Sequence, residues 1–271
     1  MITKLSALQP YSDRYAAMEF QPLVITATLK QSLIMYDPVY LDNLLARAVI
    51  EHARVNTFEM EKSLSYELPV PLKRLWTSAD GFPLWAASVF MPVGKIVRDT
   101  VYMHKRLGRF EFSDKQPKSN VGRWMDRRVP KPAMQSETKQ WQAFCVGNAS
   151  EIISLLPLIR LMGKHRNIGH GEIAEWDVSA WDGDDIQTIV QDGKLIHAVP
   201  QGVEIDLGLQ FDDPASLVGW TCPQWKPDTF SLGWRVGSSA RLPTQREPAK
   251  TRVGKNYQVL RSPVFAGNAN R

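Results

Sequence analysis

The residues best suited to ligand chemistry lie in one glycine-rich stretch, LIRLMGKHRNIGHGEIAEWDV, at residues 158–178. Glycines permit a tight turn with accessible backbone N–H groups, and basic or imidazole side chains between them could bind phosphate or a metal. The residues concerned are Gly163, Lys164, His165, Arg166, Gly169, His170 and Gly171. We call residues 163–171 the glycine loop.

The glycine loop matches neither of the two common phosphate-binding motifs. The P-loop pattern GxxxxGKS/T is absent. A dinucleotide-binding loop leads from a strand into a helix, whereas this loop is expected to lead from a helix into a strand. Two interpretations remain: a phosphate-binding turn flanked by Lys164 and Arg166, or an ordinary helix C-cap and turn.

A metal site is the weakest interpretation of these residues. His165 and His170 have no further carboxylate or thiol ligands at a recognisable spacing. Cys145 and Cys222 are far apart and outside any CxxC pair, which makes zinc and a disulfide framework improbable. We therefore expect no metal and no cofactor, and two cysteines that act as small apolar residues in a reducing cytoplasm.

A second set of candidate residues lies in the middle of the chain. If residues 96–106 are extended, Arg98, Tyr102, His104 and Arg106 share one face and could follow a nucleic-acid backbone. Residues 113–136 are rich in Pro, Gly, Ser and basic residues, which predicts a loop that becomes ordered only on binding. Trp124 could stack on a base or dock on the protein's own core. The remaining basic candidates are Lys105, Arg109, Arg123, Arg127, Arg128 and Lys131.

Positive charge is concentrated in two parts of the chain. The net charge is +5, yet residues 95–139 hold twelve Lys and Arg against five Asp and Glu, and residues 235–271 hold eight against one. Clustered cations favour a polyanionic partner because binding releases counterions from its phosphates, although two solvated basic loops remain an alternative. No apolar run approaches the length of a membrane span, and the first residues lack a secretory signal, so we expect no membrane partner.

Hydrophobic periodicity predicts an α+β fold of strands and a few helices. The predicted order is a strand at 22–30, a helix from Asp37 to about His52, short strands and turns over 65–94, a strand at 96–112, a strand at 137–147, a helix at 148–163 and a strand around 174–180. Asn148 and Glu151 form a capping pair, and Pro157 should split the helix that they begin. This order favours a ferredoxin-like arrangement with a large central insertion at about 95–136.

Three pieces of the sequence resemble the RAMP superfamily of CRISPR proteins, in particular the Cas-five-like subunit of type IV effector complexes. They are the glycine loop with EIAEWDV, the stretch PLVITATLKQSLIMYDPVYLDNLLA, and GNASEIISLL, which together span parts of residues 20–181. The resemblance implies a ferredoxin-like, RRM-type domain at 1–209 with a thumb-like insertion, followed by an extension at 210–271. It also implies a non-catalytic subunit that caps the 5′ handle of the crRNA and contacts the backbone and large subunits. Matching loop positions are Gly163, Lys164, Arg166, Gly169 and Gly171; the thumb corresponds to Arg98–Lys131 only by position and charge.

Two other functions stay open at this point. A metal-independent RNA endonuclease of the same superfamily would need a base and an acid, which His104, His165 and His170 could supply, but no two of them form a pattern that demands proton transfer. The aromatic and basic C-terminal extension could contact target DNA or wrap a neighbouring subunit.

Overall fold

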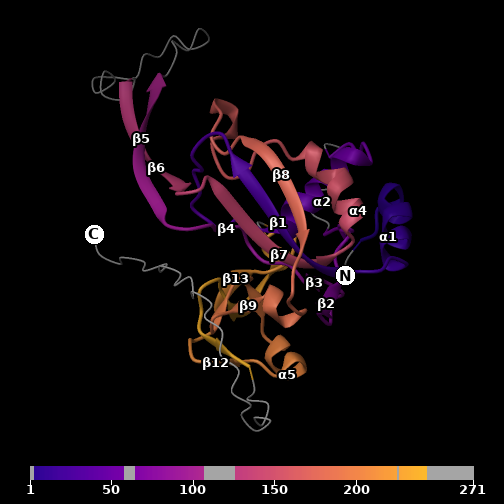
Figure 1. The fold of residues 1–271 in the computed structure, drawn as a ribbon. Helices are drawn as coiled ribbons and strands as arrows, with labels where there is room; N and C mark the ends of the chain where they lie inside the picture. The colour runs from indigo at the N-terminus through magenta and orange to yellow at the C-terminus, as the bar shows by residue number, and fades with distance from the viewer. Residues whose placement is uncertain (1–2, 58–64, 107–125, 225, 243–271) are drawn as a thin grey trace, which may run out of the picture.

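The computed structural model describes residues 3–57, 65–106, 126–224 and 226–242 (Figure 1). Its helices are α1 (Gln9–Ala16), α2 (Leu41–His52), α4 (Ala149–Leu155) and α5 (Val203–Leu207), with 3-10 turns at Ser6–Leu8, Leu156–Leu158, Arg166–Ile168, Ile186–Thr188 and Pro227–Thr229. The strands of the first half are β1 (Gln21–Leu29), β2 (Arg74–Thr77), β3 (Pro83–Trp85), β4 (Met91–Pro92), β5 (Ile96–Arg106), β6 (Asp126–Ser136) and β7 (Gln140–Gly147). Those of the second half are β8 (Ile173–Ala180), β9 (Val190–Gln191), β10 (Lys194–Leu195), β11 (Val199–Pro200), β12 (Gln210–Phe211), β13 (Ser216–Gly219), β14 (Phe230–Trp234) and β15 (Ala240–Arg241). This content agrees with the predicted α+β class.

The main sheet has the strand order β4-β7-β1-β8, and every neighbouring pair is antiparallel. Alternate residues of β1, from Leu23 to Leu29, are buried in a core to which α2 and α4 also contribute. Trp176 and Val178 of β8 pack against the same core, as period-two alternation predicts for a half-buried strand. Both helices therefore cover one face of the sheet.

Helix α2 begins at Leu41, four residues after the predicted cap at Asp37. Tyr40 is the N-cap instead, in extended conformation, because it pairs with Val89 and the Leu41 N–H donates to the Ser88 carbonyl oxygen at 3.3 Å. The predicted start was wrong because pairing with a distant segment, which local sequence does not reveal, holds the chain extended up to Tyr40.

Helix α4 begins and ends where the sequence predicts a cap and a break. The Asn148 side chain accepts a hydrogen bond from the Glu151 N–H at 3.1 Å, which satisfies one of the free donors at the helix start. The α-helix ends at Leu155, and a 3-10 turn containing Pro157 follows it. The cap and the break near Pro157 are confirmed, but the predicted helix to residue 163 is wrong beyond Leu158: Leu161 pairs with Glu172, and the Met162 N–H donates to the Gly171 carbonyl oxygen at 3.0 Å, which holds this segment out of a helix.

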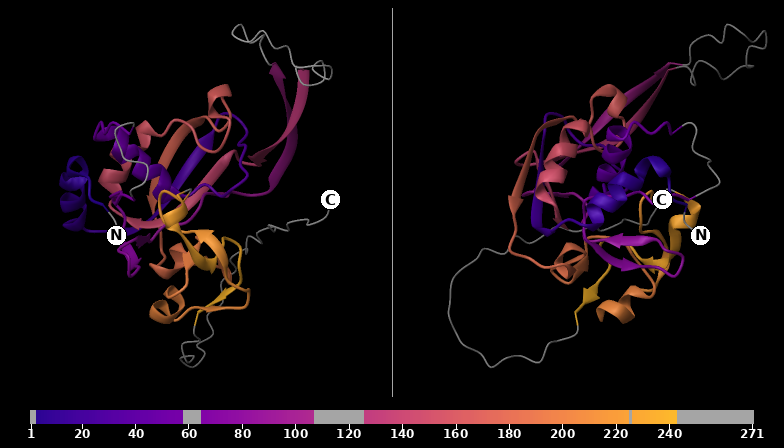
Figure 2. Two further views of the ribbon diagram at one scale, coloured as in Figure 1. Left: turned by 180° about the vertical axis from the view of Figure 1, so that it is seen from behind. Right: turned by 90° about the vertical axis from the view of Figure 1, so that its right-hand side faces the viewer.

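Strands β5 and β6 form a long hairpin that projects from the main sheet (Figures 1 and 2). Their antiparallel register runs from Ile96 opposite Ser136 to Arg106 opposite Asp126. The predicted strand at 96–112 is confirmed over its described part, 96–106, but the prediction of a loop is wrong for 126–136, because β5 supplies backbone hydrogen-bond partners that composition cannot show. Residues 107–125 lie outside the described residues.

A second hydrophobic core lies beside the first and holds much of the chain after residue 186. It combines Phe82 and Leu84 with residues such as Ile189, Val199 and Trp234. The sheet β11-β14-β13 and the pairs β9–β10 and β12–β15 surround it, and the Phe211 and Trp234 rings stack within it at 3.9 Å. We call residues 186–242 the second module. This core combines residues from before and after residue 209. The division of the chain into a domain at 1–209 and an extension at 210–271 stays a prediction.

Both cysteines are buried and free of disulfides, as predicted. Cys145 lies in the main core on β7, and burial raises the pKa of its thiol far above the usual value. Burial, followed by the nearby carboxylate of Asp42, likewise raises the pKa of the Cys222 thiol. Among the described helices, none has the length and apolar character that crossing a bilayer requires.

Candidate nucleic-acid interface

The glycine loop joins the 3-10 turn after α4 to strand β8 and contains a turn of its own at Arg166–Ile168. Four of its residues have left-handed backbone conformation: Gly163 (φ 79°), His165 (φ 57°), Gly169 (φ 88°) and Gly171 (φ 70°). Lys164, Arg166, Asn167 and Ile168 are exposed. The tip of the loop is therefore open to a ligand.

The three glycines are needed for different reasons. A Cβ at Gly163 would lie 2.7 Å from the Ile34 carbonyl oxygen, and one at Gly171 would lie 2.0 Å from the Met162 carbonyl oxygen. A Cβ at Gly169 would meet no atom within 4 Å. Gly163 and Gly171 thus allow the chain to pack against itself, whereas Gly169 is the position where another molecule could approach the backbone closely.

One short segment after β1 holds both the glycine loop and the projecting hairpin. The Ile34 carbonyl oxygen accepts the Lys164 N–H at 2.7 Å, and the Ser32 carbonyl oxygen accepts the Gly171 N–H at 3.1 Å. Leu33, between them, exchanges two backbone hydrogen bonds of 2.7 Å with Met134 of β6. The two predicted binding elements, which lie 27 residues or more apart in sequence, are therefore fixed to the same three residues.

The loop lines a groove of about 720 Å³ together with α2 and residues 158–161, which we call the loop groove. Its charged lining residues are Arg47, Glu51, Arg160, Lys164 and Arg166. Burial, followed by the positive charge of Arg47, lowers the pKa of the Arg166 guanidinium. Within the described ranges, neither Arg47, Lys164 nor Arg166 forms an ion pair with a carboxylate.

This unpaired cluster of cations has a clear electrostatic consequence. Like charges held near one another raise the free energy of the folded chain, and a bound anion would lower it. Guanidinium groups also offer several N–H donors in a planar fork, which suits phosphate oxygens. The basic side chains that line the loop groove could therefore bind an anionic group, and their donors match the oxygens of a phosphate.

Arg47 was not among the predicted site residues, nor was Arg160. Arg47 lies on the polar side of the apolar stripe of α2, next to Leu44 and Ala48. A helical wheel separates it from the core but does not show which loop it faces. Only the packing of α2 against the loop brings Arg47 to Arg166, so no local signal could have found it.

The β5–β6 hairpin carries the second set of predicted binding residues. Its register places several basic residues opposite one another on the two strands. His104 lies opposite Arg128, Lys105 opposite Arg127, and Val101 opposite Lys131. Arg98 and Tyr102 are exposed, and the Lys131 Nζ, midway along the hairpin, lies 5.3 Å from the centre of the Tyr36 ring. Arg106 ends β5. Arg109, Arg123 and Trp124 lie outside the described residues.

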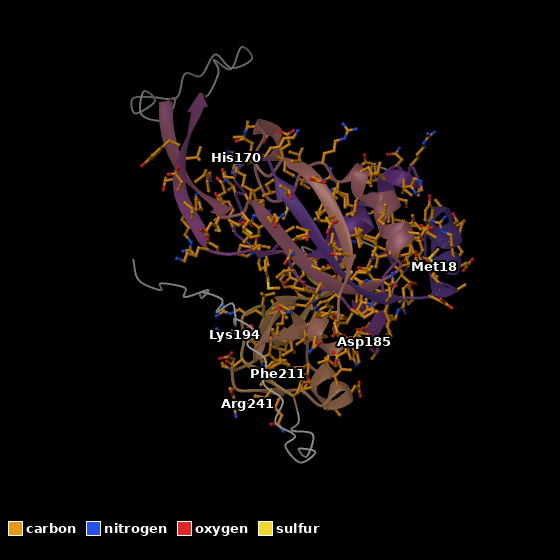
Figure 3. All side chains as sticks on the ribbon, viewed as in Figure 1. Met18, His170, Asp185, Lys194, Phe211 and Arg241 are labelled. Carbon is orange, nitrogen blue, oxygen red and sulfur yellow. The ribbon has the colours of Figure 1, made fainter. Side chains whose placement is uncertain are left out.

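The predicted histidines of the loop have separate environments. His165 is half-buried and lines the loop groove. The His170 Nδ1 lies 3.3 Å from the Ser32 carbonyl oxygen, at the end of the main sheet nearest the hairpin (Figure 3). His170 is therefore turned toward the segment that anchors the loop. Among the described residues, no three His, Cys, Asp or Glu side chains gather as a metal site would require.

The face of the main sheet opposite the helices carries mostly polar and acidic side chains, together with Val24 of β1 and Phe144 of β7, whose ring centre lies 4.8 Å from that of Trp181. Thr26 of β1 lies between Gln142 and Asp177 of the neighbouring strands, and the Gln142 amide donates to the Thr26 hydroxyl at 3.1 Å. Glu175 and Asp177 of β8 are exposed. RRM domains stack bases on aromatic residues of this sheet face. Here the positive charge lies instead at the glycine loop and on the hairpin.

Comparison with known proteins gives little guidance. No protein-family model matches the sequence, and no curated protein matches it either. Eight chains of solved structures match. One belongs to a cryo-EM structure of the type III-B Cmr-beta bound to cognate target RNA, with a TM-score of 0.29 and 12% identity, covering 65% of this chain and 67% of that chain. A likeness at that TM-score assigns neither a fold nor a function to this chain.

Proposed function

We propose that the chain is a non-catalytic, guide-RNA-binding subunit of a type IV CRISPR effector complex, with the Cas-five-like role of capping the 5′ handle of the crRNA. The observation that carries the proposal is the unpaired cluster of Arg47, Lys164 and Arg166 in an open groove beside the glycine loop. The sequence resemblance to the RAMP superfamily selects RNA among polyanions. The backbone and large subunits of that complex are the proposed protein partners.

The topology supports a ferredoxin-like RAMP domain. In chain order, β1, α2, β4, β7, α4 and β8 follow the β-α-β-β-α-β pattern, and the sheet order β4-β7-β1-β8 interleaves the two β-α-β halves. The β5–β6 hairpin leaves this unit between β4 and β7. It occupies the place in the chain where the resemblance puts the thumb.

The shape of the site favours a single strand over a duplex. The loop groove is a concave site of about 720 Å³, and its basic donors lie on the loop, on α2 and at Arg160. Single-stranded RNA presents its phosphates and unstacked bases together, so cations and exposed aromatic rings can both contact it. Tyr102, which is 60% exposed on β5, is a stacking candidate. The β5–β6 hairpin would hold the RNA strand that the glycine loop binds.

The endonuclease alternative rests on one observation, the position of His165 in the loop groove. Proton transfer to and from the 2′-hydroxyl and the leaving oxygen needs two groups within reach of the scissile phosphate. His170, the nearest second imidazole in sequence, lies against the Ser32 carbonyl oxygen. We therefore propose phosphate binding for His165. Incubating repeat RNA with the protein in EDTA checks this: the RNA should remain intact, and cleavage lost on changing His165→Ala would favour the nuclease.

The binding test uses charge reversal at one exposed lysine against a matched lysine elsewhere. Lys164→Glu should weaken binding of handle RNA by about tenfold or more, because a phosphate contact becomes a repulsion. Lys194→Glu changes the net charge equally on an exposed strand of the second module, and should leave the affinity unchanged. Fluorescence anisotropy with labelled RNA measures both. Equal affinities for the two variants would remove the glycine loop from the site.

A further inference from the structure

A second, larger groove continues from the loop groove toward the second module. It encloses about 1220 Å³ and runs from the glycine loop across the first turns of α2 to strands β13 and β14. The two grooves share Leu44, Arg47, Gly163, Lys164 and Arg166. A ligand chain seated at the glycine loop can therefore continue into the second groove, which we call the module groove.

The module groove combines cations with apolar surface. Its described lining holds five cationic side chains, Arg47, Lys164, Arg166, Lys226 and Arg235, against one carboxylate, that of Asp37. Arg235 is exposed and forms no ion pair within the described ranges. The Lys226 Nζ lies 5.8 Å from the centre of the Tyr66 ring, which also lines the groove. The basic residues thus stand on both the loop side and the module side.

Apolar residues of the second module form the far wall of the groove. Leu217 is 67% exposed and Phe230 is 37% exposed, although both are large apolar side chains. Phe230 lies opposite Gly219 in the β13–β14 register, and a Cβ on Gly219 would lie 3.3 Å from Phe230 Cε2. The phenyl ring therefore rests over a glycine backbone, and it lines the groove with its exposed part. An aromatic ring held this way is a platform for a flat ligand.

We propose that the module groove receives the bases and phosphates of the single-stranded RNA that continues from the glycine loop, with Phe230 as a base-stacking platform and Arg235 as a phosphate contact. This inference rests on the function proposed above. Alternating cations and aromatic or apolar surface in one groove is the pattern by which proteins hold single-stranded nucleic acid. An acidic peptide could meet the same cations, but continuity with the loop groove favours the strand already bound there.

The inference predicts a dependence on RNA length that separates the two grooves. We compare a loop variant, Lys164→Glu with Arg166→Glu, and a groove variant, Phe230→Ala with Arg235→Glu. A control, Leu232→Ala with Lys194→Glu, makes similar changes at exposed positions of the second module outside the described lining. Each is titrated with single-stranded RNAs of about 4 to about 16 nucleotides, the range of site sizes in such grooves.

With the shortest RNA, only the loop variant should lose affinity. With the longest RNA, the groove variant should bind at least about 5-fold more weakly than the wild type and the control, because it loses a stacking platform and a phosphate contact becomes a repulsion. Phe230→Trp in place of Phe230→Ala should recover the part of the loss that comes from stacking, because the indole also stacks. Circular dichroism and thermal unfolding establish that each variant is folded.

Two results would overturn the inference about the module groove, and a third would overturn the proposed function. If the groove variant follows the wild type at every length while the loop variant loses binding, the module groove holds no RNA but the proposed function stands. If the groove variant binds RNA normally yet fails to assemble with purified companion subunits, the groove is a protein-docking surface. If the loop variant binds like the wild type at all lengths, the proposed function itself fails.

Discussion

At the scale of single residues, the two ends of the glycine loop serve the fold and its middle is left open. Gly163 and Gly171 are tightly enclosed by the chain around residues 33–34 and by Met162, whereas Gly169 faces free space. A sequence pattern of three glycines does not distinguish these situations, since left-handed backbone and close packing both select glycine. The spacing predicted the turn, but only the structure shows which glycine a ligand can approach.

Substituting these glycines tests that division of roles. Gly171→Ala should lower the free energy of unfolding by about 3 kcal/mol or more, because its Cβ would overlap the Met162 carbonyl oxygen and its φ is left-handed. Gly169→Ala should cost only the backbone strain, about 1–2 kcal/mol. Urea denaturation measures both values. Equal losses for the two variants would show that the loop packs differently.

The two thiols provide a second test at this scale. Burial raises the pKa of both Cys145 and Cys222, so little thiolate is present near neutral pH and neither sulfur is accessible. We expect both cysteines to resist a thiol-reactive probe in the native protein and to react together once guanidinium chloride unfolds it. Rapid modification of either cysteine under native conditions would contradict the core described above.

Some residues of the candidate site could be predicted from the sequence, and others could not. Lys164 and Arg166 stand beside glycines in a recognisable pattern, and the basic strand from Arg98 was visible from its alternation. Arg47 carries no local signal, and Arg235 is visible only as the first cation of the basic segment 235–271; what each of them faces depends on packing with parts of the chain that are distant in sequence. Predicting them would require knowing how α2 and the second module pack against the loop.

At the scale of elements, local signals located the elements well where the chain supplies its own caps. Asn148 begins α4 and Pro157 ends it, as the sequence predicts. The start of α2 and the strand β6 were mispredicted, since a bridge from Tyr40 to Val89 fixes the first and pairing with β5 fixes the second. Long-range backbone pairing therefore accounts for both errors.

The cap of α4 gives a prediction at this scale. Asn148→Ala removes the acceptor for the Glu151 N–H and the donor to the Glu19 carbonyl oxygen. The free energy of unfolding should fall by about 1 kcal/mol, the usual value of an N-cap. Thermal or urea unfolding measures the loss, and Asn148→Asp, which keeps the acceptor, should recover most of it. A loss that Asn148→Asp does not reduce would mean that the cap contributes little.

Across the whole molecule, the arrangement separates a scaffold from the surfaces that would bind RNA. The main sheet and its two helices hold residues 32–34, and those residues hold both the glycine loop and the hairpin. The second module lies below the sheet in Figure 1 and forms the far wall of the module groove. The glycine loop, α2 and the second module, which come from separate parts of the chain, thus line one groove with basic residues.

The salt dependence of RNA binding tests the central claim most directly. For a single strand, each phosphate contact adds about 0.7 to the magnitude of the slope of log affinity against log salt concentration. We predict that Lys164→Gln lowers that magnitude by about 0.7, that adding Arg166→Gln lowers it by about 1.4 in total, and that Lys194→Gln leaves it unchanged. Identical slopes for the wild type and all three variants would contradict phosphate binding at the glycine loop.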